Sequence, residues 1–315
     1  MQAGPRSETG CSAIHTARPG LPSFDYVRAA SRDEVVGLLA QHGDAARLMM
    51  GGTDLLVRMR DGVIRPSIVI DVKGLPGMGE MAVDDASMLT IGAAVTMNAV
   101  ERHPQVCARW PLLAEAAGSV ASYQVRNRAT LGGNLCNASP AADIAPALLV
   151  LEGRILLYGP TGEREVRGDQ FFLGPGKSAR GAQELLTAVR IPLPPAGAVG
   201  RYLKLGRNRA GDLALVGVAV LGFRASDAPS GVRFRISLAS VAPVPLRALQ
   251  AEEVLAHHAP GEEAFAQAAE KAAEACAPID DVRASAAYRR SMVRNLTLRG
   301  LQDVWAELRE TRVGL

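Results

Sequence analysis

Two glycine loops carry the residue types best suited to binding an anion. The first, Gly51–Leu55 (GGTDL), directly follows a predicted strand, and the second, Thr130–Asn134 (TLGGN), precedes an apolar segment. Glycine has no Cβ, so backbone N–H groups in such loops can approach a ligand closely. Two loops of one chemistry could hold the two phosphates of a diphosphate without Lys or Arg, because backbone amides can suffice.

Each loop also has a purely structural interpretation. Thr53 or Asp54 could cap a helix that begins near Leu55, in a tight strand-to-helix turn. The same arrangement would aim the positive end of that helix at a phosphate. A carboxylate would repel a phosphate, so the side chain of Asp54 should face away. Thr130 and Asn134 add side-chain donors to the second loop.

Asp143 precedes the apolar run Ile144–Leu151. It could be the N-cap of a helix, with Pro146 tolerated in the first turn because no N–H is needed there. Alternatively, its carboxylate could accept hydrogen bonds from sugar hydroxyls, as acidic residues do in dinucleotide sites. The chain has neither a G-x-G-x-x-G that opens a helix after a strand nor a G-x-x-x-x-G-K-[ST]. A diphosphate cofactor would therefore need a different architecture.

The elements that position these loops alternate between helix and strand in the first part of the chain. The sequence SRDE at Ser31–Glu34 is a capping box, and Gly43 ends the helix that it starts. The expected strands are Arg47–Met50, Ser67–Asp71, Met88–Gly92 and Leu185–Ile191, with a hairpin near Arg154–Tyr158 and Glu163–Arg167. Helices are expected at Leu112–Val120 and Ile144–Leu151. A Pro- and Gly-rich linker precedes a three-stranded meander at Arg201–Leu205, Leu213–Phe223 and Val232–Ser240, followed by helices.

Composition bounds the class of protein. The chain has 315 residues, of which 48% are apolar, so we expect a globular protein of two or three compact units. The net charge of +3 is spread along the chain, which argues against nucleic-acid binding. No apolar stretch reaches the roughly 18 residues of a membrane helix, and no signal peptide is evident. The four cysteines form no C-x-x-C pair, which indicates reduced thiols in a cytoplasmic protein without a metal site of its own.

Four ordered motifs resemble the FAD-binding subunit of molybdenum hydroxylases, the family of xanthine dehydrogenase, aldehyde oxidoreductase and carbon monoxide dehydrogenase. They are LMMGGTDLL (48–56), VASYQVRNRATLGGNLCNASPAADIAPAL (120–148), ELLTAVRIP (184–192) and YLKLGRNRAGDLALVGVAV (202–220). The segment DVRASAAYRRSM (281–292) is similar to part of the family's small C-terminal domain, and the match covers about residues 22 to 312.

The resemblance implies an α+β fold. A FAD-binding domain of the vanillyl-alcohol-oxidase (PCMH) type would occupy residues 21–192, with α/β subdomains at about 21–75 and 76–192. Residues 198–312 would form a C-terminal domain of the carbon monoxide dehydrogenase flavoprotein type, with a three-stranded antiparallel sheet and helices. Residues 1–20 lie outside the resemblance, and we expect them to be a mobile tail.

The resemblance also implies a set of contacts to FAD. One side of the diphosphate would be wrapped by Leu48, Met49, Met50, Gly51, Gly52, Thr53, Asp54 and Leu55, and the other side by Thr130, Leu131, Gly132, Gly133 and Asn134. Asp143 would bond FAD hydroxyls, Leu186 and Val120 would pack near the isoalloxazine, and Lys204 would approach the ring. A cation there would stabilise the anionic reduced flavin. Without the resemblance, Lys204 would be interpreted as a solvated strand residue.

The expected function is electron transfer, with no catalytic residue in this chain and no metal. A partner subunit would hydroxylate a small heteroaromatic or aldehyde substrate at a molybdopterin centre, and a small subunit with [2Fe-2S] clusters would connect it to FAD. NAD⁺, O₂ or another acceptor would be reduced, in a complex expected to be a dimer of heterotrimers. Some relatives insert a cysteine-rich segment for a [4Fe-4S] cluster after the second glycine loop, and this chain has only Cys136 there.

The five histidines lie outside the matched loops, so FAD is expected to be bound without a covalent link. Two alternatives remain open. The chain could be a self-sufficient FAD-dependent oxidoreductase of the same fold, like UDP-N-acetylenolpyruvoylglucosamine reductase. It could also be a non-enzymatic nucleotide-binding scaffold.

Overall fold

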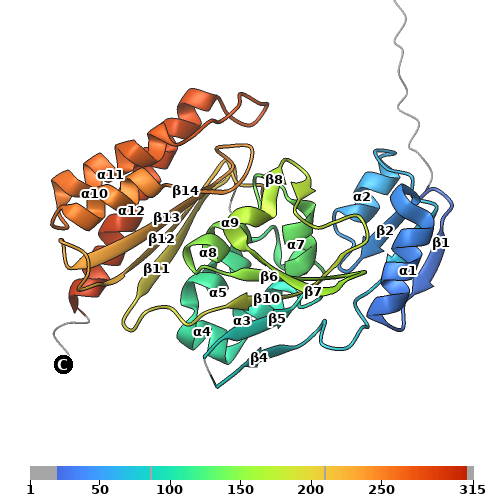
Figure 1. The fold of residues 1–315 in the computed structure, drawn as a ribbon. Helices are drawn as coiled ribbons and strands as arrows, with labels where there is room; N and C mark the ends of the chain where they lie inside the picture. Colours follow the sequence, from blue (N-terminus) through green and yellow to red (C-terminus); the bar gives the residue numbers. More distant parts are fainter. Residues whose placement is uncertain (1–19, 86, 209–210, 311–315) are drawn as a thin grey trace, which may run out of the picture.

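A small parallel sheet begins the structure, a computed structural model that describes residues 20–85, 87–208 and 211–310 (Figure 1). The strands β1 (Asp25–Arg28), β3 (Ile68–Asp71) and β2 (Ala46–Met49) pair in the order β1-β3-β2. Strand β3 is buried along its whole length, as expected for the central strand of a parallel sheet. Of the expected tail at residues 1–20, all but Gly20 lie outside the described residues.

The predicted capping box is confirmed at the start of α1 (Arg32–His42), which connects β1 to β2 through the short η1 (Gly43–Ala45). Ser31 Oγ accepts the amide of Glu34 at 3.1 Å, and Glu34 Oε2 accepts the amide of Ala30 at 2.7 Å. The helix therefore begins where the local sequence satisfies its first free N–H groups.

An antiparallel sheet of five strands forms the next layer, in the order β4-β5-β10-β6-β7. Its strands are β4 (Met81–Val83), β5 (Leu89–Gly92), β10 (Leu185–Ile191), β6 (Arg154–Gly159) and β7 (Gly162–Arg167). The connections contain α3 (Met97–Arg102), α4 (Pro104–Arg109), α5 (Pro111–Ser119), α6 (Tyr123–Arg126), α7 (Leu131–Asn137), α8 (Ile144–Val150), α9 (Gly168–Phe171) and the hairpin of β8 (Phe172–Gly174) and β9 (Lys177–Ser178). Every residue of α8 is buried, which explains its continuous apolar sequence.

The last part of the chain is an antiparallel sheet packed between helices (Figure 1). The three expected long strands are β11 (Val199–Leu205), β12 (Val216–Arg224) and β13 (Val232–Ala239), and the short β14 (Leu246–Arg247) extends the sheet to four. One face is covered by α10 (Leu249–His257), α11 (Glu262–Glu274) and α12 (Ala286–Glu310), whereas α8 and α5 pack against the sheet from the preceding unit. The arrangement confirms the α+β class.

A buried arginine ties the start of α12 to this sheet. Arg289 is 1% exposed, and its Nη1 donates to the carbonyl oxygens of Leu215 at 2.7 Å and Ser240 at 3.2 Å. Its Nη2 lies 2.8 Å from Asp281 Oδ1. Asp281 also accepts from Arg283 Nη2 at 2.6 Å. Hydrogen bonds from the Arg283 side chain, with those from backbone amides and the charge of Arg289, hold the pKa of Asp281 well below its usual range.

Replacing Asp281 should therefore destabilise the protein in a pH-dependent way. We expect Asp281→Asn to lower the free energy of unfolding at neutral pH by about 2 kcal/mol, less than the full penalty of stripping a buried pair because the amide oxygen still accepts. Since the folded-state pKa is depressed, the stabilisation is present above the unfolded pKa and is lost as the pH falls through the folded value. The difference in free energy of unfolding between the wild type and Asp281→Asn should therefore become smaller below about pH 4.

Urea denaturation across this pH range measures the effect. The matched control is Asp227→Asn, since Asp227 pairs with Arg233 at 2.8 Å but its side chain is 71% exposed. The free energy of unfolding of this control should equal that of the wild type. A gap for Asp281→Asn that stays constant with pH would contradict the assigned cause.

Candidate cofactor site

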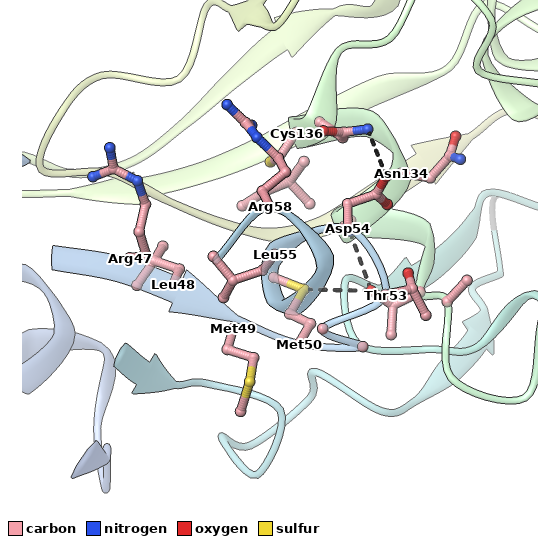
Figure 2. A pocket seen from close by; sticks show the side chains of 18 of the residues that line it. Arg47, Leu48, Met49, Met50, Thr53, Asp54, Leu55, Arg58, Asn134 and Cys136 are labelled. Atoms are coloured by element: carbon pink, nitrogen blue, oxygen red, sulfur yellow. Dashed lines mark hydrogen bonds between the residues drawn. The ribbon is translucent and has the colours of Figure 1, made fainter. Parts of the chain in front are cut away.

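A cleft opens between the small parallel sheet and α7, where the chain leaves β2 and enters α2 (Leu55–Arg60) (Figure 2). It brings together most of the residues that the sequence singled out, namely Leu48, Met49, Met50, Gly51, Gly52, Thr53, Asp54, Leu55, Thr130, Gly132, Gly133, Asn134 and Leu186. Four predicted residues do not line it: Val120, Leu131, Asp143 and Lys204. Sequence reasoning missed other lining residues, among them Arg47, Arg58, Cys136, Asn137 and Arg180.

The first glycine loop presents unpaired main-chain donors to this cleft. Among the described residues, none of the amides of Gly51–Leu55 donates to another protein group. The first hydrogen bond of the helical turn runs from Leu56 N to Gly52 O at 3.0 Å. Gly52 has φ +74°, a left-handed conformation that favours glycine. Since α2 has only six residues, its macrodipole adds little, and the free N–H groups themselves are the binding feature.

The side chain of Asp54 is bonded to α7, and the expectation that it faces away from a phosphate stays a prediction. Asp54 occupies the N-cap position of α2, one of the two alternatives that the sequence left open, but its side chain makes no capping hydrogen bond. Instead, Asp54 Oδ1 accepts from Asn137 Nδ2 at 3.2 Å (Figure 2). The side chain thus bridges α2 to the end of α7.

Gly51 is required by packing between the two loops. A Cβ at this position would lie 2.0 Å from the carbonyl oxygen of Arg128 and 3.2 Å from Ala129 Cα. Both obstacles are backbone atoms, which cannot swing aside as the end of a side chain can. The missing side chain therefore lets the segment before the second loop lie directly against the first.

The second glycine loop differs from the prediction. The amides of Leu131–Asn134 are all paired within the protein, at 2.8 to 3.2 Å, with the carbonyl oxygens of Ala93, Val95 and Thr130 and with the Thr130 hydroxyl. Its backbone is therefore not bare, and Thr130 serves as the N-cap of α7. The group left for a ligand is the side chain of Asn134, whose Oδ1 is buried without a hydrogen-bond partner.

The residues present fit a diphosphate-containing cofactor. A continuous row of free N–H groups, which are donors suited to phosphate oxygens, lies at one side of the cleft, and the unpaired Asn134 Oδ1, an acceptor suited to a cofactor hydroxyl or N–H group, comes from the other. These N–H groups are free to bond a ligand, and the buried Asn134 Oδ1 is the one group here whose lack of a partner departs from the usual pairing of buried polar atoms.

A second polar cluster lies outside the cleft, around Asp143. Asp143 Oδ2 is 2.7 Å from Lys204 Nζ, and Oδ1 accepts from the Tyr202 hydroxyl at 2.9 Å. Lys204 Nζ also donates to the carbonyl oxygen of Ser119 at 2.9 Å, next to the buried Val120. Burial raises the pKa of Asp143, against the opposing effect of Lys204.

This cluster decides between the local alternatives for two residues. Asp143 occupies the N-cap position of α8 but makes no side-chain capping bond, because both oxygens are engaged by β11. Lys204 is mostly buried and paired, which contradicts the interpretation of a solvated strand residue. Val120, Asp143 and Lys204 lie outside the cleft, and the FAD contacts expected of them stay predictions. Leu186, which was also expected to pack near the flavin, does line the cleft.

Family models match nearly the whole described chain. Residues 22–194 match the FAD binding domain in molybdopterin dehydrogenase, and residues 201–304 match the CO dehydrogenase flavoprotein C-terminal domain. The chain belongs to the FAD-binding medium subunits of the molybdenum hydroxylase family. It is thus the flavin subunit of an oxidoreductase, and its cofactor is FAD.

Individual relatives are similar to this chain over almost their full length. The chain is 35% identical to the carbon monoxide dehydrogenase medium chain of Hydrogenophaga pseudoflava, over 90% of this chain and 98% of that one. A solved structure of carbon monoxide dehydrogenase from the same organism, which lacks the Mo-pyranopterin moiety of the molybdenum cofactor, superposes with a TM-score of 0.87 over 91% of this chain and 99% of that chain, at 37% identity. The nicotine 6-hydroxylase medium subunit of Paenarthrobacter nicotinovorans is 31% identical over 91% of this chain and 99% of the relative.

The described residues contain neither a metal-binding cluster nor a membrane-spanning helix. No group of three or more His, Cys, Asp or Glu side chains there could hold a metal ion. No helix in this part of the chain is long and apolar enough to cross a membrane. The described histidines, His42, His103, His257 and His258, do not line the cleft, and the non-covalent binding of FAD stays a prediction.

Proposed function

We propose that this chain is the FAD-carrying electron-transfer subunit of a molybdenum hydroxylase complex. Its place would be between [2Fe-2S] clusters of a small partner subunit and an acceptor such as NAD⁺ or O₂. When bound, FAD supplies redox chemistry that exchanges electrons singly with clusters and in pairs with an acceptor. The observation that carries the proposal is the row of free amides at Gly51–Leu55, in a chain whose family is that of FAD subunits.

The chain's own residues have a binding role in this function. The amides of Gly51–Leu55 and the Nδ2 group of Asn134 would donate to the diphosphate, and the pair Asp143–Lys204 would lie at the flavin end. A lysine ammonium near the N1–C2 edge of the ring would stabilise the anionic reduced form. No side chain of this subunit has to act as an acid or base on the hydroxylated substrate.

The partner subunits and the substrate extend this proposal. The relatives are named as medium chains and medium subunits, which supports a complex with a large molybdopterin subunit and a small [2Fe-2S] subunit. We further propose a dimer of such heterotrimers. Nicotine is a heteroaromatic substrate and carbon monoxide is not, so the relatives' names support a range of small substrates and do not single out one.

Purification with the native partners tests the proposal. We expect acid extraction to release about one FAD per chain, mass spectrometry to identify large and small co-purifying subunits, and the substrate of the complex to bleach the flavin absorbance. A lone chain that turns over its own substrate would support a self-sufficient oxidoreductase instead. A folded complex that releases no FAD would contradict the proposal and favour a nucleotide-binding scaffold.

A further inference from the structure

The cleft carries a charge that the glycine loops do not explain. Its charged lining residues are Arg47, Arg58 and Arg180 against Asp54 alone, which gives a net charge of +2. A diphosphate that links two nucleosides carries about two negative charges at neutral pH. Backbone amides can bind such a group but cannot neutralise it, so the arginines are the lining residues able to balance its charge.

Two of these arginines are already engaged. Arg47 Nη1 donates to the carbonyl oxygens of Asp44 and Ala46, both at 2.7 Å. Arg180 Nη1 donates to those of Gly181 at 3.0 Å and Glu184 at 2.6 Å. These bonds fix their side chains against the protein's own backbone.

Arg58 is different, because its guanidinium has no acceptor or ion-pair partner among the described residues. It follows Asp54 by four residues, a spacing that allows an ion pair on a helix, but the Asp54 carboxylate is bonded to Asn137 instead. In Figure 2 the side chain of Arg58 extends from α2 toward the side of the view where Cys136 lies, and away from Asp54. A free cation on the wall of an anion-binding cleft is therefore left for the ligand.

We propose that Arg58 binds the diphosphate of FAD. The planar guanidinium can donate two parallel hydrogen bonds to phosphate oxygens, and unlike a backbone amide it also carries a full charge opposite to theirs. Arg58 thereby adds to the amides of Gly51–Leu55 a contact that depends on ionic strength. This inference rests on the proposed binding of FAD in the cleft.

The same helix offers a matched control. Arg60 lies two residues further along α2, does not line the cleft, and has Asp61 Oδ1 at 3.5 Å from its Nε. An exposed arginine on a short helix is ordinarily solvated, so Arg60 shows what the loss of such a charge does without a ligand contact. Arg58→Ala and Arg60→Ala change the net charge of the protein equally.

The test is FAD binding to the purified complex after its flavin has been removed, followed by flavin fluorescence. Arg58→Ala should raise the Kd for FAD about tenfold at low salt, the equivalent of one charge-assisted contact. Its affinity should also respond less to added salt, since salt screens the lost charge. Arg58→Lys should restore part of the affinity, and Arg60→Ala should match the wild type. ADP, used as a competitor, should lose affinity by the same factor as FAD.

Each failure has a distinct meaning. If Arg58→Ala binds FAD as tightly as Arg60→Ala, the role of Arg58 is overturned while the proposed function stands. If FAD binding weakens but ADP competition does not, Arg58 acts elsewhere than at the diphosphate, and the inference is also wrong. If the wild-type complex binds neither FAD nor ADP, both the proposed function and this inference fail.

Discussion

Gly51→Ala should strip FAD from the protein and lower its free energy of unfolding by about 3 kcal/mol, at the upper end of the usual penalty for overpacking. A Cβ at Gly51 would lie 2.0 Å from the Arg128 carbonyl oxygen and 2.9 Å from the carbonyl carbon, so one backbone segment must move. That movement displaces either the row of free amides or the segment of Arg128 and Ala129 that leads from α6 into the second loop. Flavin content after gel filtration and urea denaturation measure the two effects.

Gly133→Ala is the informative companion. A Cβ there meets within 4 Å only the Thr130 hydroxyl, at 2.8 Å, and the Gly133 amide is already bonded to that hydroxyl. Because Gly133 lies within α7, the loss of Thr130 contact is offset by helix propensity of up to about 1 kcal/mol. We expect this variant to keep its flavin. Gly79→Ala, where a Cβ meets nothing within 4 Å, controls for the substitution itself.

The opposite flavin contents in the two variants would contradict the assignment of unequal roles to the two loops. If Gly133→Ala loses FAD while Gly51→Ala retains it, the second loop supplies the main-chain contacts after all. Full flavin content in both variants would show that neither backbone segment has to keep its position for the cofactor to bind.

Asp143→Ala should produce the second large effect, a loss of about 4 kcal/mol in the free energy of unfolding together with loss of flavin. The variant leaves the Lys204 ammonium, with 14% of its side chain exposed, without its carboxylate partner, and it leaves the Tyr202 hydroxyl without an acceptor. An unpaired buried charge is more costly than the absence of the whole pair.

A double-mutant cycle separates these contributions. Asp143→Ala combined with Lys204→Met should be more stable than Asp143→Ala alone, because the stranded ammonium is removed as well. Tyr202→Phe removes only the hydroxyl and should cost about 1 kcal/mol. Thermal or urea unfolding of the wild type, Asp143→Ala, Lys204→Met and the double variant gives the coupling energy, and simple additivity of the two single changes would rule out a direct ion pair.

Local sequence rules identified the features whose partners are close in the chain. The capping box needs only the side chains of Ser31 and Glu34 and the amides of Ala30 and Glu34, so it could be predicted and is confirmed. The glycine loop after β2 could be predicted for the same reason. Strand β1 was missed, since its sequence DYVR shows no alternation, and it is fixed by pairing with β3 more than forty positions away.

Features that depend on distant partners could not be predicted. The second glycine loop looked bare because two of its amides, those of Leu131 and Gly132, bond the carbonyl oxygens of Val95 and Ala93, in the segment after β5. Arg58 was missed because it stands out only by having no acceptor among the described residues, and no local sequence pattern reveals this. Family resemblance pointed to Asp143 and Lys204, but only the structure shows that they bond to each other.

The bonds from β11 to Asp143 and Ser119 have a practical consequence for exchanging parts between relatives. Tyr202 and Lys204 are encoded after the Pro-rich linker, whereas their partners are encoded before it. A chimera joined at the linker would combine the aspartate and the carbonyl acceptor of one parent with the tyrosine and lysine of the other. Such chimeras should fold only when the crossover falls beyond Leu205, so that β11 comes from the same parent as the FAD-binding domain that it bonds to.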